Sequence, residues 1–347
     1  MVIDADTHVD ECEATWEYLD GDCRKFAPVT VMPTEAAPDG PNAGRGRWWL
    51  VGGQMVPRAI RDDAHHPPRT AREMHDVAVR LRDMDRLGVD VQVIFPTFFI
   101  RYGASDPVAE AALASAYNRW LADRCAPSGG RLRWVAQVPM LDAKRSVEEL
   151  RWAKDNGACG VYKRGYDLEK PVTDPCFFPI YEEASALDLP ICIHTGHPLP
   201  GREWDRGFPL MASFIGLITA GIPDLFPRLR FGFIEAGASW IPYCLSQLGM
   251  QRRSQALHER AQTFELKQDL FRANRLFVAI DPVDDIEYLV RLDAEDNLMI
   301  GTDYCHGDIS ANLQALGEVR RWVEDGRISE TVATKLLETN PRAFYGF

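Results

Sequence analysis

Residues 2–11 of the chain, VIDADTHVDE, contain the pattern from which the fold is predicted. The segment begins as a run of mostly apolar and β-branched residues, Val2–Thr7, and then continues into polar residues that include His8 and Glu11. A buried strand with such residues at its carboxyl end is typical of parallel α/β proteins, whose sites lie beyond the ends of the strands. The rest of the sequence contains further runs of this kind.

Seven more strand-like runs follow: Asp90–Pro96, Leu132–Pro139, Ala158–Lys163, Pro190–His194, Leu229–Glu235, Arg275–Ile280 and Leu298–Asp303. Helical patterns precede most of them or close the chain, at Met74–Gly88, Pro107–Arg124, Ser146–Asn156, Pro179–Leu187 and Ile328–Phe347, the last expected to end at Asn340-Pro341. Strands that alternate with helices predict parallel pairing, and eight of them predict a single-domain (β/α)₈ TIM barrel over residues 1–347. An open doubly wound sheet is the alternative, but no G-x-G-x-x-G motif follows the first run.

One long segment, residues 20–70, separates the first predicted strand from the second. It is rich in Pro and Gly and contains Arg47-Trp48-Trp49 and His65-His66-Pro67-Pro68. Segments of this length inside a compact domain are usually functional or disordered, and the tryptophan pair argues against plain disorder. We expect either a lid over the mouth of the barrel or a surface insertion that contacts another subunit.

The composition excludes several classes of partner. The 347 residues include 39 Lys and Arg against 51 Asp and Glu, a formal net charge of −12, which disfavours binding to nucleic acid or to anionic membranes. No apolar run reaches the roughly 18 residues of a membrane-spanning helix, and Met1–Asp6 lacks the basic region of a signal peptide. Eight cysteines without a C-x-x-C pair indicate reduced, mostly buried thiols, so we expect a cytoplasmic protein.

Polar residues gather at the ends of four of the predicted strands. They are Asp6 and His8 after the first, His194 and His197 after the fifth, Glu235 after the sixth, and Asp303 and His306 after the eighth. Asp6 and His8 are two residues apart and therefore point to the same side of a strand, whereas Asp4 lies deeper and is expected to be a buried hydrogen-bonding residue. Imidazoles and carboxylates that meet at one mouth need a cation to neutralise them, so the pattern predicts a metal site.

These motifs and others resemble the amidohydrolase-related proteins typified by aminocarboxymuconate-semialdehyde decarboxylase and the resorcylate decarboxylases. The resemblance extends over nearly the whole chain, at Asp4–Glu11, Met84–Pro96, Ala116–Asp123, Gly157–Gly165, Ile193–Pro198, Phe231–Pro242, Ile300–Asp308 and Asn340–Gly346. It implies a distorted TIM barrel of amidohydrolase type that binds a divalent metal. By the same resemblance, Asp6, His8, His194 and Asp303 are the metal ligands.

The sequence departs from the family pattern at two positions. The decarboxylases typically carry an acid–base histidine where this chain has Glu235, and they generally lack a carboxylate at the position of Glu11. Together with the four family ligands, these residues give two histidines and four carboxylates, a set that suits two iron or manganese ions better than one zinc ion. We therefore predict a dinuclear iron or manganese–iron site. The pattern resembles oxygen-activating hydroxylases of the same fold, which implies hydroxylation of a C–H bond of a small organic acid by O₂.

Alternatives remain open at this stage. Glu235 can act as a general base beside a single ion, zinc included, in a metal-dependent hydrolase or a non-oxidative decarboxylase of a small carboxylated substrate. Glu11 can cap the segment after the first strand or face solvent. A family subunit kept only as a scaffold is a third possibility, although the intact ligand positions argue against it.

Three further residues complete the predicted site. His306 is expected to contact substrate or take part in catalysis, with metal ligation as a second possibility, and His197 to line the pocket, orient a ligand or play a structural role. Lys163 is expected to contact a substrate anion or to form a salt bridge. We expect a small-molecule substrate, and an oligomer of this chain or one with a related barrel subunit.

Overall fold

The computed structural model describes residues 1–31, 47–58, 66–196, 207–255, 264–306 and 310–347. Its main sheet has eight strands in the order β1 (Ile3–Val9), β5 (Val91–Pro96), β6 (Leu132–Ala136), β7 (Ala158–Arg164), β10 (Ile191–His194), β11 (Phe231–Ile234), β12 (Leu276–Ile280) and β13 (Leu298–Ile300). Each neighbouring pair is parallel. All eight predicted strand runs are therefore confirmed, each to within a few residues at its ends.

The sheet closes between its first strand and the segment that follows its last. Thr7 forms a parallel bridge with Tyr304, and the His8 amide donates to the Tyr304 carbonyl at 2.7 Å. The Asp303 amide donates to the Asp6 carbonyl at 2.9 Å. A Cβ atom on Gly301 would lie 2.5 Å from the Asp6 Cβ, so only glycine permits this approach. This closure, which we call the seam, identifies a TIM barrel and not an open sheet.

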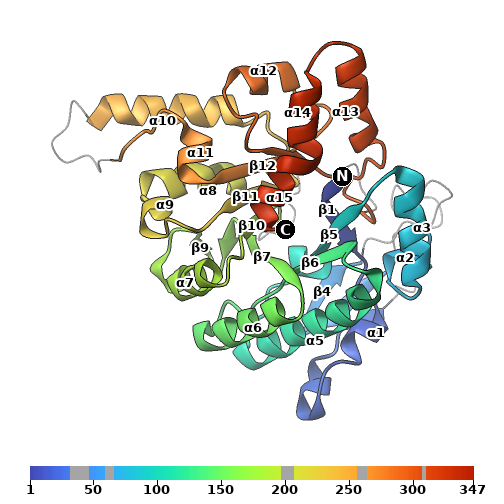
Figure 1. Cartoon of the computed structure of the whole chain (residues 1–347). Helices are drawn as coiled ribbons and strands as arrows, with labels where there is room; N and C mark the ends of the chain where they lie inside the picture. Colours follow the sequence, from blue (N-terminus) through green and yellow to red (C-terminus); the bar gives the residue numbers. More distant parts are fainter. Residues whose placement is uncertain (32–46, 59–65, 197–206, 256–263, 307–309) are drawn as a thin grey trace, which may run out of the picture.

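Helices surround the strands, as Figure 1 shows. The longer ones are α3 (Val77–Leu87), α5 (Pro107–Cys125), α6 (Ala143–Asp155), α7 (Phe178–Ala186), α8 (Phe208–Thr219), α10 (Ile241–Gln255), α12 (Ile286–Arg291) and α13 (Ala315–Glu324). The shorter ones are α1 (Glu13–Trp16), α2 (Arg69–Arg72), α4 (Phe98–Arg101), α9 (Ile222–Leu225) and α11 (Leu270–Asn274). None of the described helices is both long and apolar enough to cross a membrane.

The end of the chain differs from the sequence prediction. The closing helix does not stop at Asn340-Pro341: α14 (Glu330–Thr334) continues through a π turn at Lys335–Thr339 into α15 (Asn340–Tyr345). The wider π turn accommodates Pro341, which has no N–H to donate to the preceding turn. The Tyr345 hydroxyl then donates to the Ala5 carbonyl at 2.6 Å, which holds this helix against the first strand.

The core of the barrel is apolar, and it includes the fully buried side chains of Cys192, Ile193, Phe233 and Ile300. Asp4 is also fully buried, and its carboxylate accepts hydrogen bonds from the Thr302 amide at 2.8 Å and the Thr302 hydroxyl at 2.6 Å. The prediction of a buried hydrogen-bonding role for Asp4 is confirmed. Burial raises its pKa to about 7.

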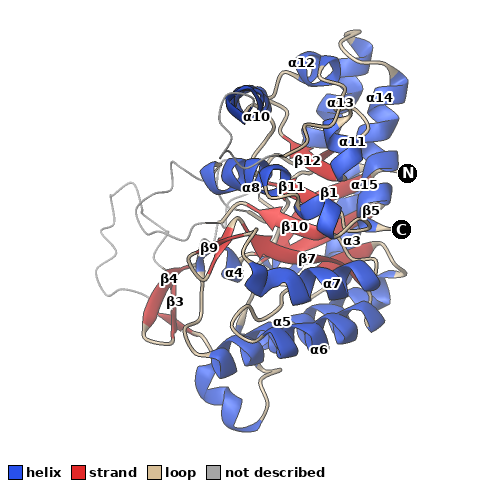
Figure 2. Ribbon diagram, turned by 90° about the vertical axis from the view of Figure 1, so that its left-hand side faces the viewer, coloured by secondary structure: helices blue, strands red, loops and turns tan. Residues whose placement is uncertain are grey.

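The segment between β1 and β5 contains a small antiparallel sheet of β2 (Val29–Val31), β3 (Trp48–Val51) and β4 (Gln54–Pro57). Trp49 is buried and its ring packs edge-on against those of Trp16 and Phe98. Figure 2 places β3 and β4 on the side of the barrel opposite the chain termini, where the parallel strands end. Residues 32–46 and 59–65 lie outside the described part, so the expected lid or subunit contact stays a prediction.

Candidate metal centre

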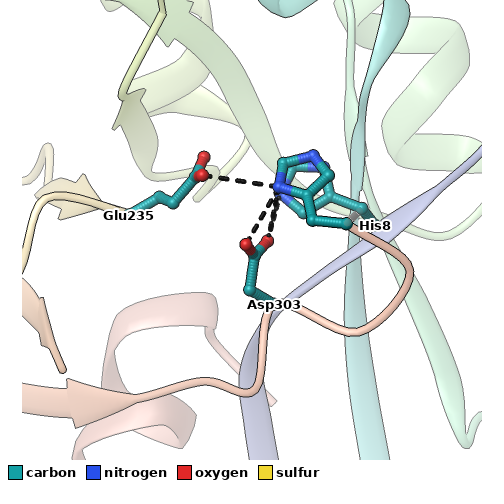
Figure 3. Close-up of side chains that lie close together, drawn as sticks. His8, Glu235 and Asp303 are labelled. Atoms are coloured by element: carbon teal, nitrogen blue, oxygen red, sulfur yellow. Dashed lines mark hydrogen bonds and ion pairs between the residues drawn. The ribbon is translucent and has the colours of Figure 1, made fainter. Parts of the chain in front are cut away.

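The ends of four strands bring six titratable side chains together, and these form the donor cluster. Asp6 and His8 come from β1, His194 ends β10, Glu235 follows β11, and Asp303 and His306 follow β13. The cluster contains two groups, Asp6–His8–His194 and His8–Glu235–Asp303–His306, which share His8. Within each group the potential metal-binding atoms all lie within 4.8 Å of one another. Figure 3 shows His8, Glu235 and Asp303 pointing toward one another.

The two strand-borne histidines present unprotonated nitrogens to each other. The Nδ1 atom of His8 lies 3.2 Å from the Pro96 carbonyl and that of His194 lies 2.6 Å from the Thr195 carbonyl. We assign a proton to each Nδ1, because a carbonyl can only accept a hydrogen bond. The Nε2 atoms, 3.1 Å apart, are then both acceptors. Burial lowers the pKa of His8 well below its usual value and that of His194 to about 4, so both rings are neutral.

Carboxylate oxygens surround the same nitrogens. Asp303 Oδ1 lies 3.2 Å and Asp6 Oδ1 3.5 Å from His8 Nε2. Asp6 Oδ1 is buried and has no hydrogen-bond partner among the described residues. Burial and the charges of Asp303 and Glu235 raise the pKa of Asp6 well above its usual value. Lone pairs that converge in this way fit a divalent cation, which Asp6, His8, His194 and Asp303 would hold.

Glu235 and His306 form a proton-carrying pair beside this position. His306 Nδ1 lies 2.8 Å from Asp303 Oδ1 and 3.4 Å from Glu235 Oε1. Its ring stacks on that of His8, with centroids 3.6 Å apart. Burial by itself lowers the pKa of His306, but the Asp303 and Glu235 carboxylates raise it well above its usual value. His306, expected to contact substrate or take part in catalysis, therefore lies inside the cluster next to Glu235.

The backbone is strained where two of these carboxylates are attached. Glu235 has φ 57° and Asp303 has φ 53°, both in the left-handed region that non-glycine residues rarely adopt. Each such residue costs on the order of 1–3 kcal/mol and persists only where its surroundings enforce it. The strain turns both carboxylates toward the imidazoles and points to a functional role for this arrangement.

Glu11 lies elsewhere. Its carboxylate accepts hydrogen bonds from the backbone amides of Thr97 at 3.1 Å and Phe98 at 2.9 Å, at the start of α4. Burial raises its pKa to about 8. The structure therefore gives Glu11 the capping role that was the alternative, although the segment it caps follows β5. The predicted second ion loses the ligand that Glu11 was expected to supply.

Lys163 is likewise outside the donor cluster. It is buried, with Nζ 2.8 Å from Asp167 Oδ2 and 3.6 Å from the centroid of the Phe177 ring. In the register of β7 and β10, Arg164 pairs with His194 and Lys163 with Ile193, so Lys163 points to the opposite side of the sheet from His194. The salt bridge is observed in place of the expected substrate contact. His197 lies outside the described residues, so its role stays a prediction.

Sequence reasoning missed Arg80, which positions the first strand. This arginine of α3 is fully buried and donates to the His8 carbonyl at 2.8 Å, the Thr7 hydroxyl at 3.1 Å and Gln92 Oε1 at 2.9 Å. Its place in the helical pattern, three residues after Val77, already puts it on the inward face of the helix. A charged residue on that face was the available signal.

Comparisons with known proteins find similar sequences and similar folds. A profile described as amidohydrolase matches residues 3–347. The gamma-resorcylate decarboxylase of Polaromonas sp. is 25% identical over 186 residues, 48% of this chain and 57% of that protein. The enzyme of the same name from Rhizobium sp. is 22% identical over 325 residues, 84% of this chain and 95% of that protein.

Two solved structures are similar along the whole chain. An amidohydrolase of Mycobacterium avium subsp. paratuberculosis has a TM-score of 0.79 at 18% identity and covers 100% of this chain and 98% of its own. The 5-carboxyvanillate decarboxylase of Novosphingobium aromaticivorans, solved with manganese and 4-hydroxy-3-methoxy-5-nitrobenzoic acid, has a TM-score of 0.68 at 18% identity, with 100% and 96% covered. At these identities the likeness shows the fold.

Proposed function

The chain belongs to the amidohydrolase family, and on that premise we propose that it is a metal-dependent, non-oxidative decarboxylase of a small carboxylated substrate. The proposal rests on one observation: two buried neutral imidazoles and two carboxylates aim acceptor atoms at a common point, with Glu235 and His306 beside it. The relatives described above include decarboxylases, which favours this alternative over the hydroxylase expected first.

A single ion is the simplest occupant of the donor cluster. Asp6, His8, His194 and Asp303 provide four donors, which suffices for one divalent cation. Glu11 is engaged by two backbone amides, so the oxygen-rich set that favoured two ions is reduced. Manganese is the first metal to test, because the 5-carboxyvanillate decarboxylase structure contains it.

The chemistry follows from the placement of these groups. When bound, the cation supplies positive charge that holds and polarises a substrate carboxylate. The bond between that carboxylate and the adjoining carbon breaks, carbon dioxide leaves, and the electron pair remains on the carbon. His306 Nδ1 lies 2.8 Å from Asp303 Oδ1 and 3.4 Å from Glu235 Oε1, and the Glu235–His306 pair supplies the proton that takes the place of carbon dioxide. Glu235 occupies the position at which the family decarboxylases typically carry an acid–base histidine.

The test separates decarboxylation from oxidation. Protein loaded with Mn²⁺ is mixed with 2,6-dihydroxybenzoate or 5-carboxyvanillate, under air and under argon, and carbon dioxide, dissolved oxygen and metal content are measured. We expect carbon dioxide release that is equal in both atmospheres and that stops when the metal is chelated. Oxygen uptake with a hydroxylated product, and two iron or manganese ions per chain, would overturn the proposal in favour of the dinuclear hydroxylase.

A further inference from the structure

A second polar site lies beside the donor cluster, at the carboxyl ends of β5, β6 and β7. Its walls include Phe99, Tyr102, Gln137, Tyr162 and Arg164. None of these residues is used by the chemistry proposed above. We call this cavity the arginine pocket.

The arginine pocket adjoins His194. Arg164 pairs with His194 in the register of β7 and β10, and neighbouring strands lie about 4.8 Å apart. A Cβ atom on Gly196 would lie 2.9 Å from Arg164 Cγ, so the arginine stem packs against the turn that follows His194. The Tyr162 ring centroid is 5.6 Å from that of His194. The arginine pocket and the donor cluster are therefore neighbours.

The pocket contains buried polar atoms that form no hydrogen bond within the described part of the chain. Tyr162 Oη and Gln137 Oε1 are buried and have no hydrogen-bond partner among the described residues. Arg164 donates through Nε to Asp167 Oδ1 at 2.8 Å and through Nη1 to the Tyr102 carbonyl at 3.3 Å. These bonds leave Nη2 to face Gly103, where a Cβ atom would lie 3.4 Å away. Leaving buried donors and acceptors unmet is unfavourable, so the pocket suits a ligand that meets them.

The charges favour an anion. Asp167 is shared by two cations, Lys163 at 2.8 Å and Arg164 at 2.8 Å, so this triad carries one net positive charge. Glu110 also lines the pocket, but its carboxylate is engaged by the backbone, since it accepts from the Leu141 amide at 2.7 Å. An arginine nitrogen and a phenol hydroxyl together are suitable donors for one carboxylate.

We propose that the arginine pocket binds a second carboxylate of the substrate, remote from the one held at the donor cluster. The aromatic walls suit a planar molecule, so the substrate class is an aromatic or conjugated dicarboxylate, and Gln137 Oε1 accepts a hydrogen bond from a hydroxyl on it. The inference rests on the proposed function, because it assumes that the first carboxylate lies at the metal. It makes Arg164 the residue that selects dicarboxylates over monocarboxylates.

The test measures selection by binding alone. Benzene-1,3-dicarboxylate and benzoate are titrated calorimetrically into the Mn²⁺-loaded wild type and into Arg164→Met, Arg164→Lys and Tyr162→Phe. Arg164→Met should fold, because Asp167 keeps Lys163 as its partner. Arg164→Lys retains the charge and guards against a folding failure. Arg151→Met is the matched control, since Arg151 is exposed and pairs with Glu183.

We expect the wild type to bind the dicarboxylate at least about tenfold more tightly than benzoate, the effect of one charge-assisted interaction. Arg164→Met should abolish this preference without changing benzoate binding, Arg164→Lys and Tyr162→Phe should reduce it, and Arg151→Met should preserve it. Metal-dependent binding of both acids without preference, or a preference that survives Arg164→Met, would contradict the proposal that the arginine pocket binds a second carboxylate. The decarboxylase proposal would still stand. No metal-dependent binding of either acid would overturn both.

Discussion

Replacing His194 by alanine tests whether the donor cluster holds a cation. The structure places His194 Nε2 3.1 Å from His8 Nε2 and 3.9 Å from Asp6 Oδ1, so the substitution removes one of four donors. A ligand present at 100 times its dissociation constant stabilises the folded state by about 2.7 kcal/mol. At about 2 °C per kcal/mol for a chain of this size, Mn²⁺ at that concentration should raise the wild-type melting temperature by about 5 °C.

The stabilisation by Mn²⁺ that His194→Ala should lose follows from the same relation between ligand concentration and dissociation constant. Even the partners that only orient a metal ligand are worth about 10–100-fold in affinity, so loss of a direct donor should weaken binding at least about 100-fold. The same Mn²⁺ concentration then equals the dissociation constant and stabilises the variant by only about 0.4 kcal/mol, a shift of less than about 1 °C.

Thermal unfolding with and without Mn²⁺, paired with metal analysis, measures both quantities. The matched control is His75→Ala, which removes a half-exposed imidazole outside the donor cluster and should keep the full shift. A shift of equal size in wild type and His194→Ala, or full metal content in the variant, would refute the assignment of His194 as a ligand.

Three further predictions follow from individual contacts. Glu235→Gln should retain one Mn²⁺ per chain and lower turnover about 100-fold or more, because it removes a proton carrier and not a required ligand; metal loss measured with the activity loss would instead restore Glu235 as a ligand. Arg80→Met should lower the free energy of unfolding by about 3–5 kcal/mol in urea titrations, since three buried acceptors lose their donor; a loss below about 1 kcal/mol would contradict this. Burial alone would raise the pKa of Asp167, but Lys163 and Arg164 lower it below its ordinary value of 3.8. Its stabilisation is therefore complete above about pH 4 and is lost as the pH falls further, so the stability gap between wild type and Asp167→Asn should narrow from pH 6 to pH 3, and a constant gap would contradict the ion pair.

Much of the fold was predictable because each strand and helix carries a local signal. Short apolar runs that alternate with helical patterns require parallel pairing, and the spacing of Asp6 and His8 required both to face one side. The donor cluster followed, since parallel strands end at one mouth. The amphipathic pattern of residues 74–88 located α3 in the same way, and the buried Arg80 was readable within it.

The predictions for Glu11 and Lys163 were wrong because they depended on a long-range contact and on which face of a strand a side chain takes. Glu11 reaches amides 86 and 87 residues away, a contact that no local pattern encodes. Lys163 and Arg164 are adjacent cations at the end of β7, a strand buried along most of its length, so no alternation of polar and apolar residues indicates which one faces inward. The left-handed backbone conformation at Glu235 was equally unpredictable, because glutamate rarely adopts it and the sequence contains no signal for it.

The seam has a consequence for the order in which the molecule assembles. It joins Asp6 and His8, near the start of the chain, to Asp303 and Tyr304, about 300 residues later, so it closes a very large loop and should form late. Three of the four proposed metal ligands lie on it. A bound ion would therefore act as a clasp between the two ends of the polypeptide, and its departure would loosen the barrel first at this junction. The amide protons of His8 and Asp303, which make the backbone bonds of the seam, would then exchange with solvent long before those of β10 and β11.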